Sequence, residues 1–264
     1  NSSFEFLGSF YKKRIKRILP SLLVYVAIMS TLICIVNFSS GVQLKTGLTS
    51  IFGVSNIYLY SRYLDYFHFH AELNPFVNTW SLGVEEQFYF IFPFFFLFFK
   101  LHTNKKALSH LFKLIAFLSF LSFIWFQILY FKNIDAAYYL MPFRFWEIGM
   151  GCLCGIFLFK NKNSIPLNNN FLLINNILLF SCFFITYKYG YLSTLLITLS
   201  TVFFLLDRKS KNSNKLLFTN NFSVFIGKLS FSLYLWHWGI LTIGRWTINN
   251  NWSLLIQLIL TFLI

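Results

Sequence analysis

The residues best placed to do chemistry are a few ionisable side chains that interrupt strongly apolar stretches. Glu85 and Glu86 are adjacent at the head of a phenylalanine-rich run, NTWSLGVEEQFYFIFP, at residues 78–93. Ionisable residues at or inside a membrane segment are costly to bury and are functional candidates by default. Alternatively, both glutamates lie among lipid headgroups and mark a helix start, where the helix dipole favours acidic residues. The spacing fits both interpretations.

A second polar island, PFRFWE at residues 142–147, places Arg144 and Glu147 inside another apolar stretch. Residues three apart on a helix share one face, so these two side chains can meet. In the functional interpretation, Arg144 binds a ligand oxygen and Glu147 orients it. In the alternative, the two charges neutralise each other, which is the usual form in which membrane helices tolerate charge.

A third island, SFSLYLWHW at residues 230–238, contains His237 between two tryptophans. Histidine can act as donor, acceptor or base near neutral pH. A reaction at a ligand hydroxyl needs a base that takes the hydroxyl proton, and Ser232 and Tyr234 nearby could hydrogen-bond such a ligand. The alternative is an ordinary belt of interfacial aromatic residues.

Arg14 and Arg17 lie three residues apart in the basic run FYKKRIKRILP at residues 10–20. Arginine suits bidentate contacts with phosphate, so the pair could clamp the phosphates of a cytoplasmic anion. The alternative is a topology signal, because any cytoplasmic loop can be basic.

A metal centre is not predicted. His68, His70 and Glu72 alternate along the chain, would point apart on a strand, and have no further ligands at a suitable spacing. The four cysteines, which lie in apolar runs, are interpreted as small packing residues. They are Cys34, Cys152, Cys154 and Cys182.

The composition indicates a membrane protein. Of 264 residues, 57% are hydrophobic and 22% aromatic, and the mean hydropathy is +0.63. Long uncharged apolar runs recur, which predicts an all-α, polytopic transmembrane helical bundle in a lipid bilayer. The net charge of +14 does not indicate a nucleic-acid partner, because Lys and Arg gather in short loops between apolar runs, as the positive-inside rule predicts.

Residues 44–60 are the ambiguous stretch in the predicted topology, because glycine and polar residues dilute them. If they cross the membrane, the basic loops at 100–106, 160–162 and 208–215 fall outside. If they form a re-entrant or surface helix, all three loops are cytoplasmic, and we favour this reading. The predicted spans are 20–38, 84–99, 107–130, 136–159, 171–187, 191–206 and 222–243, with an outer loop at 65–83.

This topology predicts a common depth for five candidate residues. Glu85, Glu86, Arg144, Glu147 and His237 all fall toward the outer side, whereas the arginines of the basic run fall on the opposite face. We expect Glu86, Arg144, Glu147 and His237 to line one wet cavity, since burying them separately in lipid would cost more.

The polar islands together resemble the acyltransferase-3 family of bacterial membrane acyltransferases, in the branch that O-acetylates surface polysaccharides such as O-antigen. The basic run at 10–20 and the SNIY sequence at 55–58 are similar to that family too. The resemblance extends over about residues 10–240, and the blocks occur in the family's order.

The resemblance implies a multi-pass O-acyltransferase of the bacterial inner membrane. Its donor would be cytoplasmic acetyl-CoA or another acyl-CoA, used as a substrate and not as a bound cofactor. Its acceptor would be a hydroxyl of a glycan or lipid-linked sugar. Arg14 and Arg17 match the family's donor-associated Arg-x-x-Arg element. The residues that would orient and activate the acceptor are Glu85, Glu86, Arg144, Glu147 and His237.

Two elements of the family are missing from the sequence. One is a basic residue followed, after ten positions, by a histidine regarded as the main catalytic base; the other is Gly-Val-Asp-Val-Phe-Phe. We therefore expect one membrane domain over residues 1–264, truncated at both ends, with no soluble domain. Two rival hypotheses stay open: a transporter or flippase without acyl chemistry, to which intramembrane charges are equally suited, and an inactive remnant of the acyltransferase.

Overall fold

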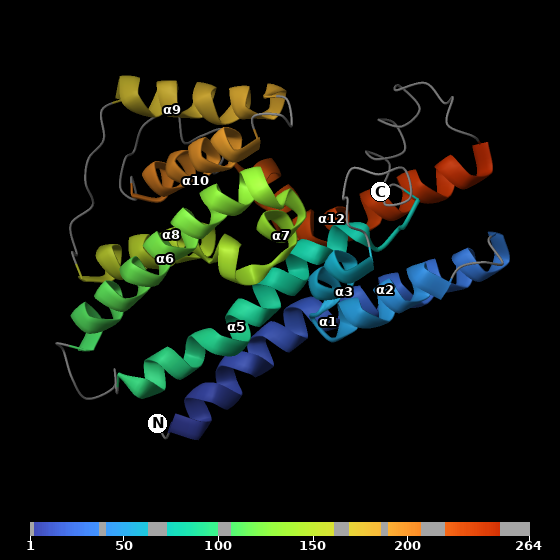
Figure 1. Ribbon diagram of the computed structural model, residues 1–264, viewed down its shortest axis with the longest axis horizontal. Helices are drawn as coiled ribbons and strands as arrows, with labels where there is room; N and C mark the ends of the chain where they lie inside the picture. The colour runs from blue at the N-terminus through green and yellow to red at the C-terminus, as the bar shows by residue number, and fades with distance from the viewer. Residues whose placement is uncertain are drawn as a thin grey trace. The chain divides into compact units, whose positions relative to one another are not determined.

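The computed structural model describes residues 3–36, 41–62, 73–99, 107–160, 169–185, 190–206 and 220–248, and every regular element in these ranges is helical. This confirms the predicted all-α fold class. The α-helices are α1 (Ser3–Val36), α2 (Gly41–Ile51), α3 (Ser55–Arg62), α5 (Trp80–Phe98), α6 (Ala107–Lys132), α7 (Ile134–Tyr139), α8 (Met141–Lys160), α9 (Asn169–Ser181), α10 (Gly190–Leu206) and α12 (Asn221–Ile248) (Figure 1). The short 3-10 helices are η1 (Val77–Thr79) and η2 (Cys182–Phe184).

Three helical stretches in the described residues are long and apolar enough to cross a bilayer, which takes about 20 residues. They are Glu5–Val36, Ala107–Lys132 and Ile134–Lys160. These stretches support a membrane location. Two other expected spans correspond to α9 and α10, which are apolar but shorter.

The basic run lies on a helix, which corrects its predicted placement in a loop. Helix α1 begins at Ser3 and continues through Pro20, which was expected to open the first span. Lys and Arg are good helix formers, so the basic run continues the helix. Pro20 has no N–H for the carbonyl four residues earlier, but the helix does not end there.

The ambiguous stretch at 44–60 is broken into two short helices, α2 and α3. The break lies at Gly53, whose φ of 67° is in the left-handed region that favours glycine. The Val54 N–H donates to the Thr49 carbonyl at 3.0 Å and the Gly53 N–H to the Ser50 carbonyl at 3.2 Å, as in a Schellman cap. Helix α2 has 11 residues, about 16 Å in length, so it cannot cross an apolar layer of about 30 Å.

Several sequence predictions fall outside the described residues. These include the basic loops at 100–106 and 208–215, most of the loop at 160–162, and the residues His68, His70 and Glu72. Their topology therefore stays a prediction.

The described residues divide between two compact units. The first unit takes its residues from Asn1–Leu97, Tyr138–Met141 and Lys228–Ile264; the second takes them from Phe98–Ala137 and Pro142–Gly227. In the first unit, one face of α1 forms the core against α12 and the chain before α5. The buried core residues are Ile18, Leu22, Tyr25, Val26, Met29, Ile33, Phe76, Leu82 and Leu235.

Helices α1 and α5 lie side by side in the first unit and run in opposite directions (Figure 1). The rings of Phe6 and Phe96 are 5.7 Å apart, and the Tyr11 hydroxyl donates to the Phe90 carbonyl at 2.9 Å. Farther along α1, the Tyr25 hydroxyl donates to the Pro75 carbonyl at 2.6 Å. This pairing places the start of α5 beside the middle of α1.

The chain before α5 is buried, which differs from the outer loop predicted at 65–83. Asn74, Phe76, Val77 and Thr79 are all at most 1% exposed. Trp238 of α12 donates its indole N–H to the Asn74 carbonyl at 2.9 Å. The low hydrophobicity of this stretch predicts a loop, but its polar groups form hydrogen bonds inside the first unit.

The second unit contains α6, α8, α9 and α10. Its core joins Phe126, Ala137 and Trp146, with Tyr191 of α10 packed against them. A Cβ at Gly149 of α8 would collide with Ser119 of α6, so the two helices approach closely there.

Candidate functional site

Arg14 lies between aromatic rings at the crossing of α1 and α5. Its guanidinium carbon is 3.7 Å from the centroid of the Tyr89 ring on α5, and 5.7 Å from that of Phe10 on its own helix. A guanidinium this close to a ring face is held by cation–π attraction. The position of Arg14 is therefore fixed by a neighbouring helix, which a plain topology signal does not require.

Glu85 faces the same cluster. It lies one turn before Tyr89 on α5, so the two side chains share the face of that helix that meets Arg14. The expectation that Glu85 and the arginines lie on opposite faces of the membrane is therefore wrong. It measured depth from the ends of separate spans, whereas α5 begins at Trp80 beside the middle of the longer helix α1.

A pocket of about 360 Å³ opens along one face of α1 beside this cluster. Its lining combines three cations with two phenylalanine rings and one hydroxyl. Such a lining suits a ligand that carries both negative charge and a flat or apolar part. The lining residues are Phe6, Ser9, Phe10, Lys13, Arg14 and Arg17.

Glu86 points away from this cluster and toward the break between α2 and α3. Its side chain fills the space in which a Cβ at Gly53 would stand. Gln87 holds the same turn, because its amide N–H groups donate to the Gly53 carbonyl at 3.1 Å and to Asn56 Oδ1 at 2.8 Å. Asn56 in turn donates to the Tyr139 carbonyl at 2.9 Å. The two adjacent glutamates therefore face different parts of the first unit: Glu85 faces α1 and Glu86 faces the turn at Gly53.

His237 is oriented by its own helix. Its Nδ1 atom lies 3.0 Å from the carbonyl oxygen of Leu233. Because a carbonyl only accepts, Nδ1 carries the hydrogen in this contact, and the neutral ring keeps a lone pair on Nε2. A base needs such a lone pair.

A chain of hydroxyls joins α12 to the start of α5 near His237. The Tyr234 hydroxyl donates to the Asn78 carbonyl, so Ser81, at 2.6 Å, must donate to Tyr234. The Asn78 amide donates to the Tyr234 carbonyl at 2.7 Å, while its Oδ1 atom is buried without a hydrogen-bond partner.

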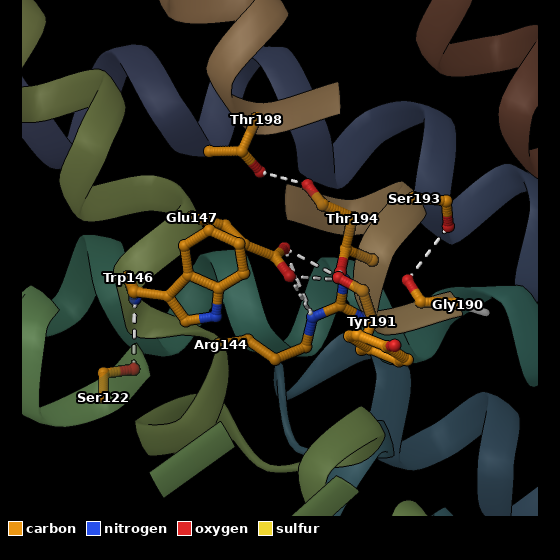
Figure 2. A network of polar contacts seen from close by, with 9 residues as sticks. All are labelled: Ser122, Arg144, Trp146, Glu147, Gly190, Tyr191, Ser193, Thr194 and Thr198. Carbon is orange, nitrogen blue, oxygen red and sulfur yellow. Dashed lines mark hydrogen bonds and ion pairs between the residues drawn. The ribbon is translucent and has the colours of Figure 1, made fainter. Parts of the chain in front are cut away.

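Arg144 and Glu147 form the predicted ion pair in the second unit. Four N–O distances between them lie between 2.8 and 3.3 Å, and their side chains are 12% and 23% exposed. Figure 2 shows the pair with Tyr191 and Thr194 of α10 beside it. The Thr194 hydroxyl donates to the Tyr191 carbonyl at 3.0 Å, which leaves its oxygen free to accept.

Trp146, between the charged residues in sequence, sets the orientation of this pair. Its backbone N–H donates to the Ser122 hydroxyl at 3.1 Å (Figure 2). The centroid of its ring lies 5.1 Å from that of Phe123. Trp146 therefore anchors α8 to α6. Its indole N–H is buried with no hydrogen-bond partner.

The predicted site residues are distributed between the two units. Glu85, Glu86 and His237 lie in the first unit, with Arg14 and Arg17, while the Arg144–Glu147 pair lies in the second. The ion pair is confirmed. The cavity expected to join Glu86, Arg144, Glu147 and His237 stays a prediction.

Comparison with known proteins gives the family. The family model described as an acyltransferase domain, acyltransferase-3, matches residues 1–264. The chain belongs to the acyltransferase-3 family. No solved structure matches it.

Relatives within the acyltransferase-3 family include two named O-acetyltransferases. The peptidoglycan O-acetyltransferase OatA of Listeria monocytogenes is 30% identical over 286 residues, covering 100% of this chain and 45% of that protein. The O-acetyltransferase OatA of Staphylococcus aureus is 29% identical over 256 residues, covering 89% of this chain and 41% of that protein. A protein of Haemophilus influenzae is 32% identical over 189 residues, covering 68% of this chain and 76% of that protein. The chain thus spans less than half of the length of the two named relatives.

Proposed function

We propose that the protein is a membrane O-acyltransferase that moves an acetyl group from cytoplasmic acyl-CoA to a hydroxyl of a cell-surface or lipid-linked polysaccharide. The match to the acyltransferase-3 family over residues 1–264 carries this proposal. The names of the two OatA relatives favour acetyl as the acyl group, and one of them names peptidoglycan as the acceptor. The protein would be a multi-pass component of the bacterial inner membrane.

The pocket beside α1 supports acyl-CoA as the donor. Coenzyme A carries several phosphates and a flat adenine, and the pocket offers three cations and two phenylalanine rings. Arg14 and Arg17 would bind the phosphates, with Arg14 already held against Tyr89. The pocket would thus bind the phosphates and adenine of the donor, away from the reacting thioester.

The lone pair on His237 Nε2 supports a role as base. In the transfer, the acceptor hydroxyl loses its proton to a base while its oxygen attacks the thioester carbonyl. The carbon–sulfur bond then breaks, and the thiolate of coenzyme A takes up the proton, leaving an acetyl ester and free thiol.

Glu86, Arg144 and Glu147 complete the proposed acceptor-side set. Glu86 is held beside the turn at Gly53, and Arg144 and Glu147 are held as a pair. We propose that they orient the glycan, with Arg144 contacting an acyl or sugar oxygen. This role follows from the charge that each would otherwise bury in an apolar helix.

The decisive experiment uses the complete protein that contains this chain. Membranes that hold it are supplied with acetyl-CoA labelled in the acetyl group, and the glycan is then isolated and treated with mild base. The proposal predicts labelled acetate released from the glycan. Glycan movement without any label would favour a transporter or flippase, and neither result would favour an inactive remnant.

A further inference from the structure

The ring that supports Arg14 lies behind the pocket on α1 and not inside it. Arg14 lines that pocket, whereas Tyr89, whose ring its guanidinium contacts, is not one of the lining residues. Tyr89 belongs to α5, and the carbonyl of the next residue, Phe90, accepts a hydrogen bond from the Tyr11 hydroxyl of α1 at 2.9 Å. The two contacts are adjacent, so α5 is fixed against α1 at the point where it supports Arg14.

The distance between the guanidinium and the ring determines how their two planes lie. The Arg14 guanidinium carbon is 3.7 Å from the centroid of the Tyr89 ring, which is the contact distance of two stacked planes. A guanidinium standing edge-on at this distance would push its nitrogen atoms into the ring. The ring therefore covers a face of the guanidinium, and the N–H groups, which lie in its plane, are left at the edge. A phosphate binds to such an edge through two parallel hydrogen bonds.

The three cations of the pocket differ in how firmly they are held. Arg14 is half-buried against the Tyr89 ring. Lys13 and Arg17 are exposed. A long charged side chain that moves freely in solvent loses rotamer entropy when a ligand fixes it, and a side chain that is already held loses less. We therefore expect Arg14 to make the oriented contact with a phosphate, and the two exposed cations to add a screened attraction.

We propose that Tyr89 is the positioning residue of the donor clamp formed by Arg14 and Arg17. Its ring holds the Arg14 guanidinium so that the N–H edge meets a donor phosphate, which makes Arg14 the residue that orients the donor. This rests on the proposed function, in which the pocket binds the phosphates of acyl-CoA. Tyr89 does not touch the donor, so its whole effect on binding passes through Arg14.

The test measures the dissociation constant of unacylated coenzyme A for the purified complete protein by calorimetry. Tyr89→Leu keeps an apolar side chain but removes the ring, so the competent orientation of Arg14 becomes one of several and binding should weaken about fivefold. Tyr89→Phe keeps the ring and should bind within about twofold of the wild type. Phe94→Leu is the matched control, because it removes an exposed ring from the same helix, and it should bind like the wild type.

A double-variant cycle distinguishes positioning from general packing. Arg14→Ala should weaken coenzyme A binding about tenfold, through the loss of a charge-assisted contact with phosphate. Adding Tyr89→Leu to Arg14→Ala should then change binding by less than about twofold, because the ring has no guanidinium left to hold. A second, additive loss in the double variant overturns the inference. So does unchanged binding in a folded Tyr89→Leu protein, or an equal loss in Tyr89→Phe.

Lysine substitutions test the same assignment while Tyr89 stays in place, which guards against a folding defect in Tyr89→Leu. Lysine keeps the charge but has no planar edge of donors. Arg14→Lys should therefore weaken coenzyme A binding about fivefold, nearly as much as Arg14→Ala. Arg17→Lys should weaken it only about twofold, because Arg17 contributes mainly charge. Equal losses in the two lysine variants would contradict the special role of Arg14.

Inorganic pyrophosphate separates this inference from the proposed function. If pyrophosphate binding weakens about fivefold in Tyr89→Leu and not in Tyr89→Phe, Tyr89 positions Arg14 even where coenzyme A fails to bind. In that case acyl-CoA is the wrong donor and the clamp serves another phosphorylated ligand. If the wild type binds coenzyme A and neither ligand responds to Tyr89→Leu, the donor stands and the positioning role is wrong. A wild type that binds neither ligand overturns both.

Discussion

The Nδ1 atom of His237 lies 3.0 Å from the carbonyl oxygen of Leu233, one turn earlier in α12. This contact fixes which ring nitrogen carries hydrogen, so Nε2 is the atom that can accept a proton. A helix carbonyl, which cannot change its protonation state, thus sets the tautomer of the candidate base. No residue outside α12 is needed for this contact.

The first prediction follows from that tautomer. His237→Gln keeps a polar side chain but removes the base, so acetyl transfer to the glycan should fall about 100-fold, the lower range for losing a general base. Membrane abundance should be unchanged. His110→Ala, on the exposed face of α6, is the control and should remain fully active. Full activity in His237→Gln would reduce His237 to an interfacial anchor.

The second prediction concerns the donor clamp. Arg17→Ala should raise the KM for acetyl-CoA about tenfold with little change in kcat, as expected for losing a charge-assisted contact with phosphate. Arg17→Lys should raise it less, because lysine keeps the charge but not the bidentate geometry. Lys16→Ala removes one charge from the same helix outside the pocket lining and should leave the KM near that of the wild type. A KM for acetyl-CoA that stays at the wild-type value in all three variants would make the basic run a topology signal only.

The third prediction concerns the turn at Gly53. Gly53→Ala places a Cβ where the Glu86 side chain stands, on a backbone with φ of 67°, which costs a side-chain residue about 1–2 kcal/mol. The protein should unfold at a lower temperature in detergent and lose transfer activity. Gly8→Ala, where a Cβ would meet nothing within 4 Å, should not be destabilised. An unaltered Gly53→Ala protein would contradict both the left-handed backbone at residue 53 and the close contact with Glu86.

The fourth prediction separates two roles of the Arg144–Glu147 pair. Glu147→Gln removes the carboxylate that pairs with the Arg144 cation and should destabilise the protein by about 1–2 kcal/mol, less than for a fully buried pair. Replacing both residues by Gln should restore abundance, because no lone charge remains. If the pair also binds the acceptor, the double variant should be abundant but inactive. A double variant that regains activity would assign the pair to stability alone.

The fifth prediction tests the topology. In a background where the four native cysteines are replaced by serine, Lys160→Cys at the end of α8 should resist an impermeant thiol reagent added to intact cells. A cysteine at Glu72, in the predicted outer loop, should react. The reverse pattern would place the basic loops outside.

The sequence predicted which segments form helices better than it predicted the contacts between them. Apolar length predicted the helices α6, α8 and α12 because bilayer thickness constrains such segments strongly. The Arg144–Glu147 pair followed from helix geometry alone, since its partners are three residues apart. Local rules reach as far as one helical turn.

Contacts between distant segments could not be predicted in this way. Gln87 and Asn56 support the turn beside Glu86 although they are 31 residues apart, and neither stands out by charge. The segment before α5 was predicted to be a loop because it is polar, and its place in the core of the first unit is visible only from its burial in the structure. The predicted depth of Glu85 was wrong because α1 and α5 differ in length and lie side by side over only part of that length.

The turn at Gly53 is synthesised well before the residues that support it. Its carbonyl is bonded by Gln87, which is synthesised 34 residues later, and Asn56 is bonded to the carbonyl of Tyr139, 83 residues later. At about 5–20 residues per second, α2 and α3 wait for seconds before these partners exist. The Schellman cap covers that interval, since it uses only groups within the turn itself. The hairpin can therefore leave the translocation machinery with its helix end already satisfied, and dock against α5 once that helix has arrived.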